Sequence, residues 1–224
     1  MKIGIICSSG GGSFRAAHPV LSRRGHGFHV LTDRPCGVEE FCRSADLPWE
    51  RLEEPDNRRF SERAFDRFEA SGGVDIVVLF YLRLVTPPLV DRVPCFNVHP
   101  SLLPAFRGFH ALGAALAARA RFFGATLHLA TDCADAGPII AQVCDPLPLG
   151  ANEADLAKRS FLHKTYLLFV LIELLERNEV SADNGWTPPD GLSATPHANP
   201  SLRTQAYIDA VHEIQSAERC VVFS

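Results

Sequence analysis

The sequence contains no apolar run long enough to span a membrane. A spanning helix needs about 18 consecutive apolar residues, and the longest run, Tyr166–Ile172, is far shorter. The apolar stretch Met1–Cys7 is too short for a signal peptide and leads straight into a glycine-rich segment. We therefore expect Met1–Cys7 to be the first core strand, and we expect no contact with a membrane.

Paired cysteines and an excess of positive charge are also missing. The seven cysteines are scattered, with no CxxC pair and no regular spacing. This pattern is typical of reduced, mostly buried thiols in a cytoplasmic protein and not of a disulfide framework. We expect no bound metal. The net charge of −4 argues against binding nucleic acid by bulk electrostatics, so small soluble molecules are the expected partners.

The chain has enough apolar sequence for one substantial domain, or for a core domain with an appendage. It has 224 residues, of which 46% are hydrophobic. Continuous β-branched runs predict buried strands, and amphipathic stretches between them predict helices. The predicted strands are Lys2–Ser8, Gly27–Asp33, an edge strand Pro48–Leu52, and Val74–Tyr81; the predicted helices are Phe14–Arg24, Val38–Ala45, Arg58–Ser71 and a short one ending near Arg92. This alternation predicts an α/β fold with a parallel sheet.

The second half of the chain departs from this alternation. The strands Ala125–Thr131 and Ile139–Cys144 are close in sequence and predict a hairpin-like extension of the sheet, after a helical stretch Phe109–Ala120. Asn152, with Asp155 three residues later, predicts the capped start of a long helix to about Asn178. A loop, Asp183–Pro200, and a last helix, Ser201–Ala217, complete the prediction.

A glycine loop, Ser9-Gly10-Gly11-Gly12-Ser13, separates the first strand from the first helix. A strand, a glycine loop and a helix in this order can present backbone N–H groups to an anion. The same glycines also suit a tight turn, and their spacing is not the GxGxxG of dinucleotide folds. The sequence leaves both interpretations open.

The stretch Cys95–Pro104 carries the residues best suited to chemistry. Asn97 and His99 are two apart, so in a strand their side chains share one face. An amide can stabilise an oxyanion, and an imidazole can move a proton near pH 7. The alternative is a strand end capped by two polar residues. A later loop, Asp132–Pro138, holds two carboxylates; it serves turn geometry alone unless Asp135 reaches His99.

These pieces, in this order, resemble the folate-dependent formyltransferase family. The most specific matches are FNVHPSLLP at Phe96–Pro104 and DxxDxGPI at Asp132–Ile139, and the resemblance runs from Met1 to about Asn178. It implies a three-layer, Rossmann-like, mostly parallel sheet with helices on both faces. It also implies that a formyl group passes from 10-formyltetrahydrofolate to an amine, within a catalytic domain of residues 1–180 followed by an extension of residues 181–224.

The resemblance assigns roles to matching positions. Asn97 would donate to the formyl oxygen, His99 would stabilise the oxyanion or shuttle a proton, and Asp135 would hold His99 in place. Since His99 ends a strand at a cleft, we expect it to lie outside the core. The segments implied to bind the folate contain Tyr81, Leu82, Arg83, Leu84, Val85, Asp132 and Ala134. The acceptor would lie at Gly10, Gly11, Gly12 and Ser13.

The resemblance leaves the identity of the acceptor amine open. A small amine is implied, with glycinamide ribonucleotide or a related amine as the first candidate. Phe14 stands where enzymes for that substrate usually carry asparagine, which favours a different acceptor. Two other functions share these residues: hydrolysis of 10-formyltetrahydrofolate, and ligand binding without catalysis. A homodimer is compatible with the sequence.

Overall fold

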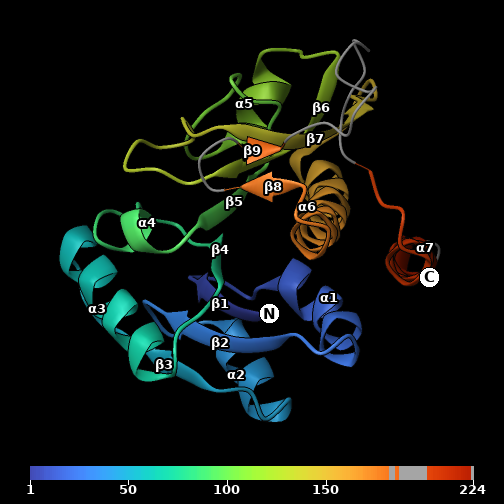
Figure 1. The fold of residues 1–224 in the computed structure, drawn as a ribbon. Helices are drawn as coiled ribbons and strands as arrows, with labels where there is room; N and C mark the ends of the chain where they lie inside the picture. Colours follow the sequence, from blue (N-terminus) through green and yellow to red (C-terminus); the bar gives the residue numbers. More distant parts are fainter. Residues whose placement is uncertain (182–184, 187–200, 223–224) are drawn as a thin grey trace. The chain divides into compact units, whose positions relative to one another are not determined.

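Figure 1 shows the computed structural model, which describes residues 1–181, 185–186 and 201–222. The chain forms two compact units. Unit 1 comprises Met1–Asn97 together with Leu129–Gly137, and unit 2 comprises Val98–His128 and the chain from Pro138 onward. The predicted division between residues 180 and 181 stays a prediction.

Unit 1 is built on parallel strands. The strands are β1 (Lys2–Cys7), β2 (Gly27–Thr32), β3 (Trp49–Arg51), β4 (Ile76–Phe80) and β5 (Cys95–His99, whose last two residues belong to unit 2). β1 pairs with β2 and β4, β2 pairs with β3, and β4 pairs with β5, all in parallel. The sheet has seven strands in the order β3-β2-β1-β4-β5-β6-β7, so the predicted edge strand is confirmed.

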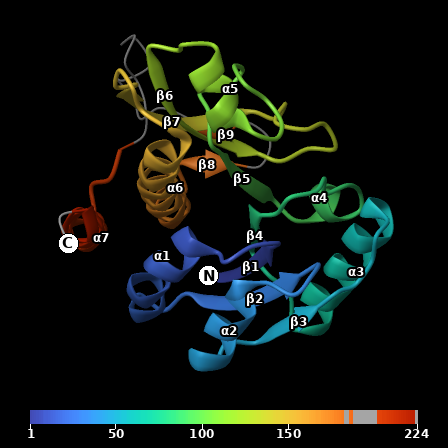
Figure 2. The same ribbon diagram turned by 180° about the vertical axis from the view of Figure 1, so that it is seen from behind.

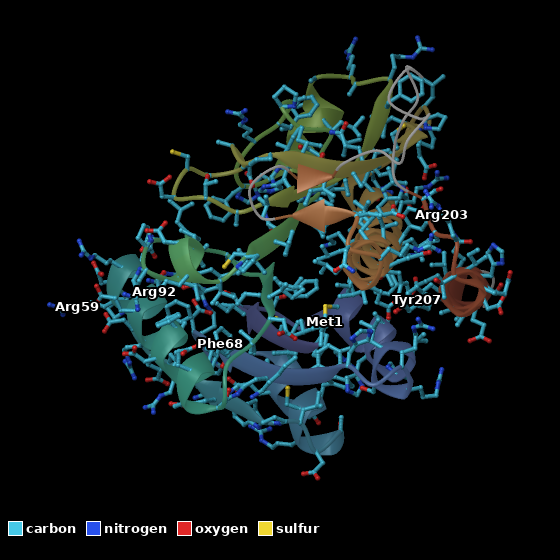
Figure 3. The ribbon with its side chains drawn as sticks, in the orientation of Figure 1. Met1, Arg59, Phe68, Arg92, Arg203 and Tyr207 are labelled. Carbon is cyan, nitrogen blue, oxygen red and sulfur yellow. The ribbon has the colours of Figure 1, made fainter. Side chains whose placement is uncertain are left out.

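Helices cover both faces of these parallel strands, as predicted. They are α1 (Gly12–Arg23), α2 (Gly37–Ser44), α3 (Asn57–Ala70) and α4 (Leu89–Arg92), and Figure 2 shows them from behind. On one face, Phe14 of α1 packs on Phe28 of β2, with ring centroids 5.2 Å apart. On the other face, Phe68 of α3 (Figure 3) lies over Gly4, where an added Cβ would come within 2.8 Å of the Phe68 ring. Side chains therefore alternate between two helical layers, as the strand period of two requires.

Unit 2 contains an antiparallel strand pair and a long buried helix. Its elements are α5 (Ala111–Ala117), β6 (Phe122–Leu129, whose last residue belongs to unit 1), β7 (Ile139–Pro146), α6 (Glu153–Glu176), the short pair β8 (Val180–Ser181) and β9 (Gly185–Trp186), and α7 (Gln205–Val222). β6 and β7 pair antiparallel, which confirms the predicted hairpin-like extension. Asn152 and Asp155 form the predicted capping box of α6.

The last helix is anchored to α6 by a buried carboxylate. Glu173, 3% exposed, accepts hydrogen bonds from the backbone N–H groups of Arg203 and Thr204 at 3.0–3.1 Å. Tyr207 is fully buried and stacks on Phe169 of α6 (Figure 3). These contacts hold the two residues before α7 and Tyr207 in its first turn, so the helix packs on α6 within unit 2.

Several boundaries differ from the prediction. α1 begins at Gly12, two residues before the predicted start, and Pro19 lies inside it. The helix predicted over 109–120 is shorter at both ends. The predicted loop 183–200 lies outside the described residues except for Gly185–Trp186, which pair with β8. Within the part of the chain that the structure describes, no helix has the length and apolar character to cross a membrane.

Candidate active site

The carboxyl end of β5 brings Asn97 to the aspartate loop within unit 1. The Asn97 Nδ2 donates to Asp135 Oδ1 at 3.4 Å, and both side chains are half-buried. The contact is long, as hydrogen bonds of catalytic groups often are before substrate binds. Two residues 38 positions apart therefore meet where the sequence predicted chemistry.

The aspartate loop owes its shape to a close approach of its own backbone. A Cβ added to Gly137 would lie 1.9 Å from the carbonyl oxygen of Leu129, so only glycine fits there. At the start of the loop, Ala130 N–H donates to Cys95 O at 2.7 Å. Asp135 itself has φ 49°, in the left-handed region. These constraints hold the loop beside the strand that carries Asn97.

His99 is buried, contrary to our expectation for a residue at the end of a strand. It is 5% exposed, and its Nε2 lies 2.9 Å from the carbonyl oxygen of Phe106, within unit 2. Since a carbonyl can only accept, Nε2 carries the hydrogen in this contact.

A polar network in unit 2 positions the loop that supplies this carbonyl. Thr126, fully buried, donates to Ser101 O at 2.7 Å and accepts from Leu103 N–H at 3.0 Å. Gln142 donates to Leu103 O and to Thr126 Oγ1, both at 2.9 Å. Phe106 has φ 53°, which turns the chain after the network. The orientation of His99 is thus set by residues that the sequence did not mark.

His99 and Asp135 belong to different units. The prediction that Asp135 holds His99 in its useful state therefore stays a prediction. What unit 1 supplies by itself is the amide of Asn97 and the carboxylate of Asp135. What unit 2 supplies is an imidazole fixed in one tautomer.

The segment predicted to bind the folate, Tyr81–Val85, alternates between core and surface. Tyr81 and Val85 pack into the unit 1 core together with Ala130, next to the aspartate loop. Leu82 and Leu84 are 48% and 39% exposed. An exposed apolar wall beside the aspartate loop suits a planar aromatic ligand such as a pterin, so this part of unit 1 fits the expected cosubstrate.

Arg83 uses its side chain within the fold. Its guanidinium donates to Asn57 Oδ1 at 2.9 Å, to Glu54 O at 2.7 Å and to Pro55 O. It also lies over the Phe60 ring at 5.6 Å. Any contact of Arg83 with the folate would therefore involve its backbone. Asp132 and Ala134 are exposed on the aspartate loop, and their contacts with folate stay predictions.

The glycine loop is shaped by one constrained glycine, and most of its other residues are exposed. Gly11 has φ 60°, and a Cβ there would lie 2.9 Å from Val38 Cγ2, so no other residue fits. Ser9, Gly10 and Gly12 are exposed. The first turn of α1 contains no acidic residue. No carboxylate within that turn therefore offsets the positive end of the helix dipole, which faces the loop.

Phe14 does not enter this loop. It is fully buried against Phe28, Phe41 and His18, with ring centroids 5.2–5.8 Å apart. The aromatic ring therefore does not fill the glycine loop. The expectation that Phe14 disfavours glycinamide ribonucleotide stays a prediction.

The cysteines near the loop are not nucleophiles. Burial raises the pKa of the Cys7 thiol, and burial together with Cys7 raises the pKa of Cys36 to about 11. Both thiols are therefore protonated at neutral pH. Thiolate chemistry at these two positions is excluded.

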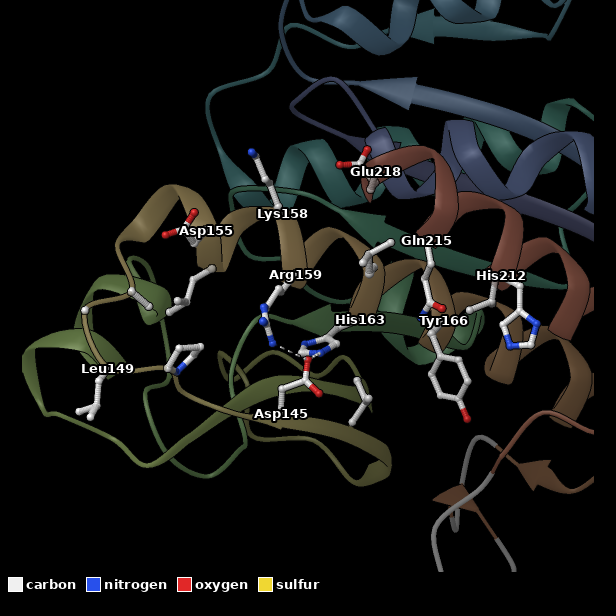
Figure 4. Close-up of a pocket in the computed structure, with 17 residues that line it drawn as sticks. Asp145, Leu149, Asp155, Lys158, Arg159, His163, Tyr166, His212, Gln215 and Glu218 are labelled. Carbon is white, nitrogen blue, oxygen red and sulfur yellow. Dashed lines mark hydrogen bonds and ion pairs between the residues drawn. The ribbon is translucent and has the colours of Figure 1, made fainter. Parts of the chain in front are cut away.

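A separate cavity lies within unit 2 (Figure 4). It measures about 930 Å³ and is lined by the β7–α6 loop, α6 and α7. Asp145 accepts from His163 Nε2 at 3.0 Å and pairs with Arg159 Nη1 at 3.6 Å. Burial lowers the pKa of His163 in spite of Asp145, so this histidine is neutral. The described lining includes none of the predicted site residues.

The sequence reasoning missed an ion pair at the end of β2. Asp33, whose side chain is 1% exposed, accepts from Arg34 Nε at 3.1 Å and Nη2 at 2.7 Å. Burial alone would raise its pKa, but hydrogen bonds from Arg34 and Ser8 and the charge of Arg34 lower it. An acidic residue about 20 positions after a glycine loop was the available signal.

Comparison with known proteins agrees with these features. Residues 1–167 match the family described as Formyl transferase. The chain is 32% identical over 185 residues to the chloroplastic phosphoribosylglycinamide formyltransferase of Arabidopsis thaliana, covering 75% of this chain and 63% of that protein. It is 32% identical over 157 residues to the phosphoribosylglycinamide formyltransferase of Mycobacterium tuberculosis H37Rv, covering 68% of this chain and 73% of that protein.

A solved structure resembles most of the chain. The glycinamide ribonucleotide transformylase 1 of Symbiobacterium toebii superposes with a TM-score of 0.75 at 30% identity, covering 81% of this chain and 90% of that chain. A shorter match, 40% identical over 75 residues, links the chain to the formyltetrahydrofolate deformylase of Mycobacterium bovis. The predicted α/β architecture and family are confirmed: the chain belongs to the formyl transferase family.

Proposed function

We propose that the chain transfers the formyl group of 10-formyltetrahydrofolate to the amine of a small phosphorylated metabolite, with glycinamide ribonucleotide as the first candidate. The observation that carries the proposal is the contact between Asn97 and Asp135 at the end of β5, beside the exposed leucines of Tyr81–Val85. The relatives in Arabidopsis and Mycobacterium, which bear the name of that activity, support it.

The reaction needs a donor for the developing oxyanion and a route for one proton. The amine attacks the formyl carbon, a C–N bond to the acceptor forms, and the bond to N10 of the folate breaks. Asn97 donates from Nδ2 to the oxygen that gains negative charge, which is worth roughly 10²–10³ in rate for a single donor. Asp135 already accepts from the same amide, so it orients Nδ2 before substrate arrives.

His99 supplies the proton transfer in this scheme. Its Nε2–H is held by the carbonyl of Phe106, which leaves Nδ1 as the nitrogen that exchanges a proton. A positioned acid or base contributes roughly 10²–10⁴ in rate. In this proposal the proton leaves the attacking amine and is delivered to N10 of the departing folate.

The folate and acceptor ends are assigned to different segments of unit 1. The leucines at 82 and 84 form the apolar wall for the pterin, and the aspartate loop provides polar groups next to it. The glycine loop after Ser9, whose residues Gly10 and Gly12 are exposed, receives the acceptor's phosphate. A homodimeric assembly and a cytoplasmic location stay predictions.

The test is an assay of purified protein with 10-formyltetrahydrofolate and glycinamide ribonucleotide. We expect tetrahydrofolate release that depends on the amine, together with formylated product by mass spectrometry. His99→Ala should reduce turnover by about 10²–10⁴, whereas His212→Ala, an exposed histidine on α7, should not. Release without any amine would instead assign the hydrolase function, for which the deformylase match is the supporting observation.

The folate segment has its own matched pair of variants. Leu82→Asn should weaken folate binding measured by calorimetry, because a polar side chain replaces the apolar wall. Leu149→Asn changes another exposed leucine, outside unit 1, and should leave folate affinity unchanged. Absence of folate binding by the unmodified protein would leave only the non-catalytic alternative.

A further inference from the structure

The ion pair at the end of β2 fixes a cation on the β2–α2 loop. Arg34 donates two hydrogen bonds to Asp33 Oδ2, from Nε and Nη2. The carboxylate is buried, and the Arg34 side chain is 47% exposed. The guanidinium is thus anchored on one edge while its other edge faces solvent. Because anchoring restricts the side chain before a ligand binds, less entropy is lost on binding.

The β2–α2 loop that carries Arg34 packs directly on the glycine loop. Val38 N–H donates to Ser9 O at 3.3 Å, and a Cβ on Gly37 would lie 3.3 Å from Gly10 Cα. The two loops therefore form one continuous surface within unit 1. In βαβ folds, the residues that end the second strand reach the ligand whose phosphate is held at the first turn.

Ser8 links this ion pair to the folate segment. Its hydroxyl accepts from Leu82 N–H at 3.2 Å and hydrogen bonds to Asp33. Arg34 therefore lies where the loop proposed for the acceptor adjoins the segment proposed for the folate. Arg83 approaches the same carboxylate at 3.9 Å, but its own guanidinium is committed to Asn57 and to two backbone carbonyls.

We propose that Arg34 is a specificity-determining residue that binds the phosphate of the acceptor at the glycine loop, and that Asp33 is its positioning residue. This inference rests on the proposed function and adds to it the side chain that recognises the acceptor's phosphate. The backbone N–H groups of the loop supply hydrogen bonds, and Arg34 supplies the positive charge that the loop lacks. Arginine suits this role because its donors match phosphate oxygens in pairs.

The experiment compares variants at Arg34 with a control on the same structural layer. Arg34→Gln should raise KM for glycinamide ribonucleotide by about 10- to 100-fold, the range for a lost charge-assisted hydrogen bond. Its kcat and its KM for 10-formyltetrahydrofolate should change by less than about threefold. Arg34→Lys should restore part of the affinity. Arg43→Gln removes the same charge from a 59% exposed side chain on α2 and should have no effect on either KM.

Two further measurements distinguish the inference from its alternatives. Asp33→Asn should raise the acceptor KM by a smaller factor, since Arg34 keeps its charge but loses its anchor. The dephosphorylated acceptor, glycinamide ribonucleoside, should react equally poorly with the unmodified protein and with Arg34→Gln. Inorganic phosphate can be titrated while the amide signals of Gly10–Ser13 are followed by NMR. The Kd for phosphate should be about tenfold lower for the unmodified protein than for Arg34→Gln.

The outcomes separate this inference from the proposed function. If the unmodified protein transfers no formyl group to any amine, the proposed function fails. If it is active but Arg34→Gln keeps its acceptor KM and its phosphate affinity, the inference about Arg34 is overturned. A rise in KM for 10-formyltetrahydrofolate alone would also overturn it, because Arg34 would then serve the folate.

Discussion

Changing Asn97 to Asp places two carboxylates where the structure has an amide facing a carboxylate. In the native protein the Asn97 Nδ2 lies 3.4 Å from Asp135 Oδ1. The substitution keeps the size of the side chain and reverses the interaction from attraction to repulsion. The result should appear both in the free energy of unfolding and in turnover.

The size of the effect follows from that distance. Two unit charges at this separation repel by about 5 kcal/mol at an effective dielectric constant of ~20. Both residues are half-buried, so water screens the pair and we expect a loss of about 1–2 kcal/mol. Repulsion raises the folded-state pKa of one carboxyl above its unfolded value of about 4. The folded variant then binds more protons than the unfolded chain, so stability falls as pH rises above ~4.

The assay is urea unfolding at pH about 4.5 and about 8, with three variants. When the pH is raised from about 4.5 to about 8, the free energy of unfolding of Asn97→Asp should fall by about 1–2 kcal/mol more than that of the unmodified protein. Asn97→Ala should show no added pH dependence. The double variant Asn97→Asp with Asp135→Asn exchanges the two groups and should recover the stability at pH 8. All three should turn over roughly 10²–10³ more slowly than the unmodified protein, since none has the amide donor at position 97.

Two results would refute this reasoning. Unchanged pH dependence in Asn97→Asp would mean that the residue does not face Asp135 in solution. Recovery of turnover in the double variant would mean that the amide donor is not required at position 97 and can also act from position 135.

Three further changes test parts of the fold by urea unfolding. Arg83→Leu should lower the free energy of unfolding by about 1–3 kcal/mol, because the acceptors that Arg83 now satisfies lose their donor. Arg58→Leu, which changes a 78% exposed side chain, should lower it by under about 0.5 kcal/mol. Equal losses would contradict a structural role for Arg83. Glu173→Gln should cost about 1–3 kcal/mol by weakening the anchor of α7, with the exposed Glu213→Gln as its neutral control. Phe14→Ala should cost about 3–5 kcal/mol while leaving acceptor KM unchanged in the folded protein; a raised KM would show that the ring takes part in the phosphate site.

Much of the architecture could be read from local sequence pattern. Buried parallel strands are continuous apolar runs, and Val74–Tyr81 contains β4 for that reason. The capping box at Asn152 was visible because its two side chains are three residues apart and act within one turn. Asn97 and His99 stood out because an amide and an imidazole interrupt an apolar strand.

The orientation of single side chains could not be read in this way. Whether Phe14 faces the glycine loop or the core depends on where α1 begins, and the start at Gly12 turns the ring to the core. The partner of His99 is a backbone carbonyl, and every residue has one, so no residue type marks it. Its position comes from the network around Thr126, which joins segments about 25 residues apart.

By itself, the sequence determined the alternation of strands and helices, the glycine loop and the residue types at the end of β5, because these depend on patterns within a few residues. Tertiary structure alone decided that Asn97 contacts Asp135, that Asp33 anchors Arg34, and that the Arg83 side chain binds Asn57. These contacts arise where different segments reach one end of the sheet. Their distances are set by packing between segments, which no local pattern encodes.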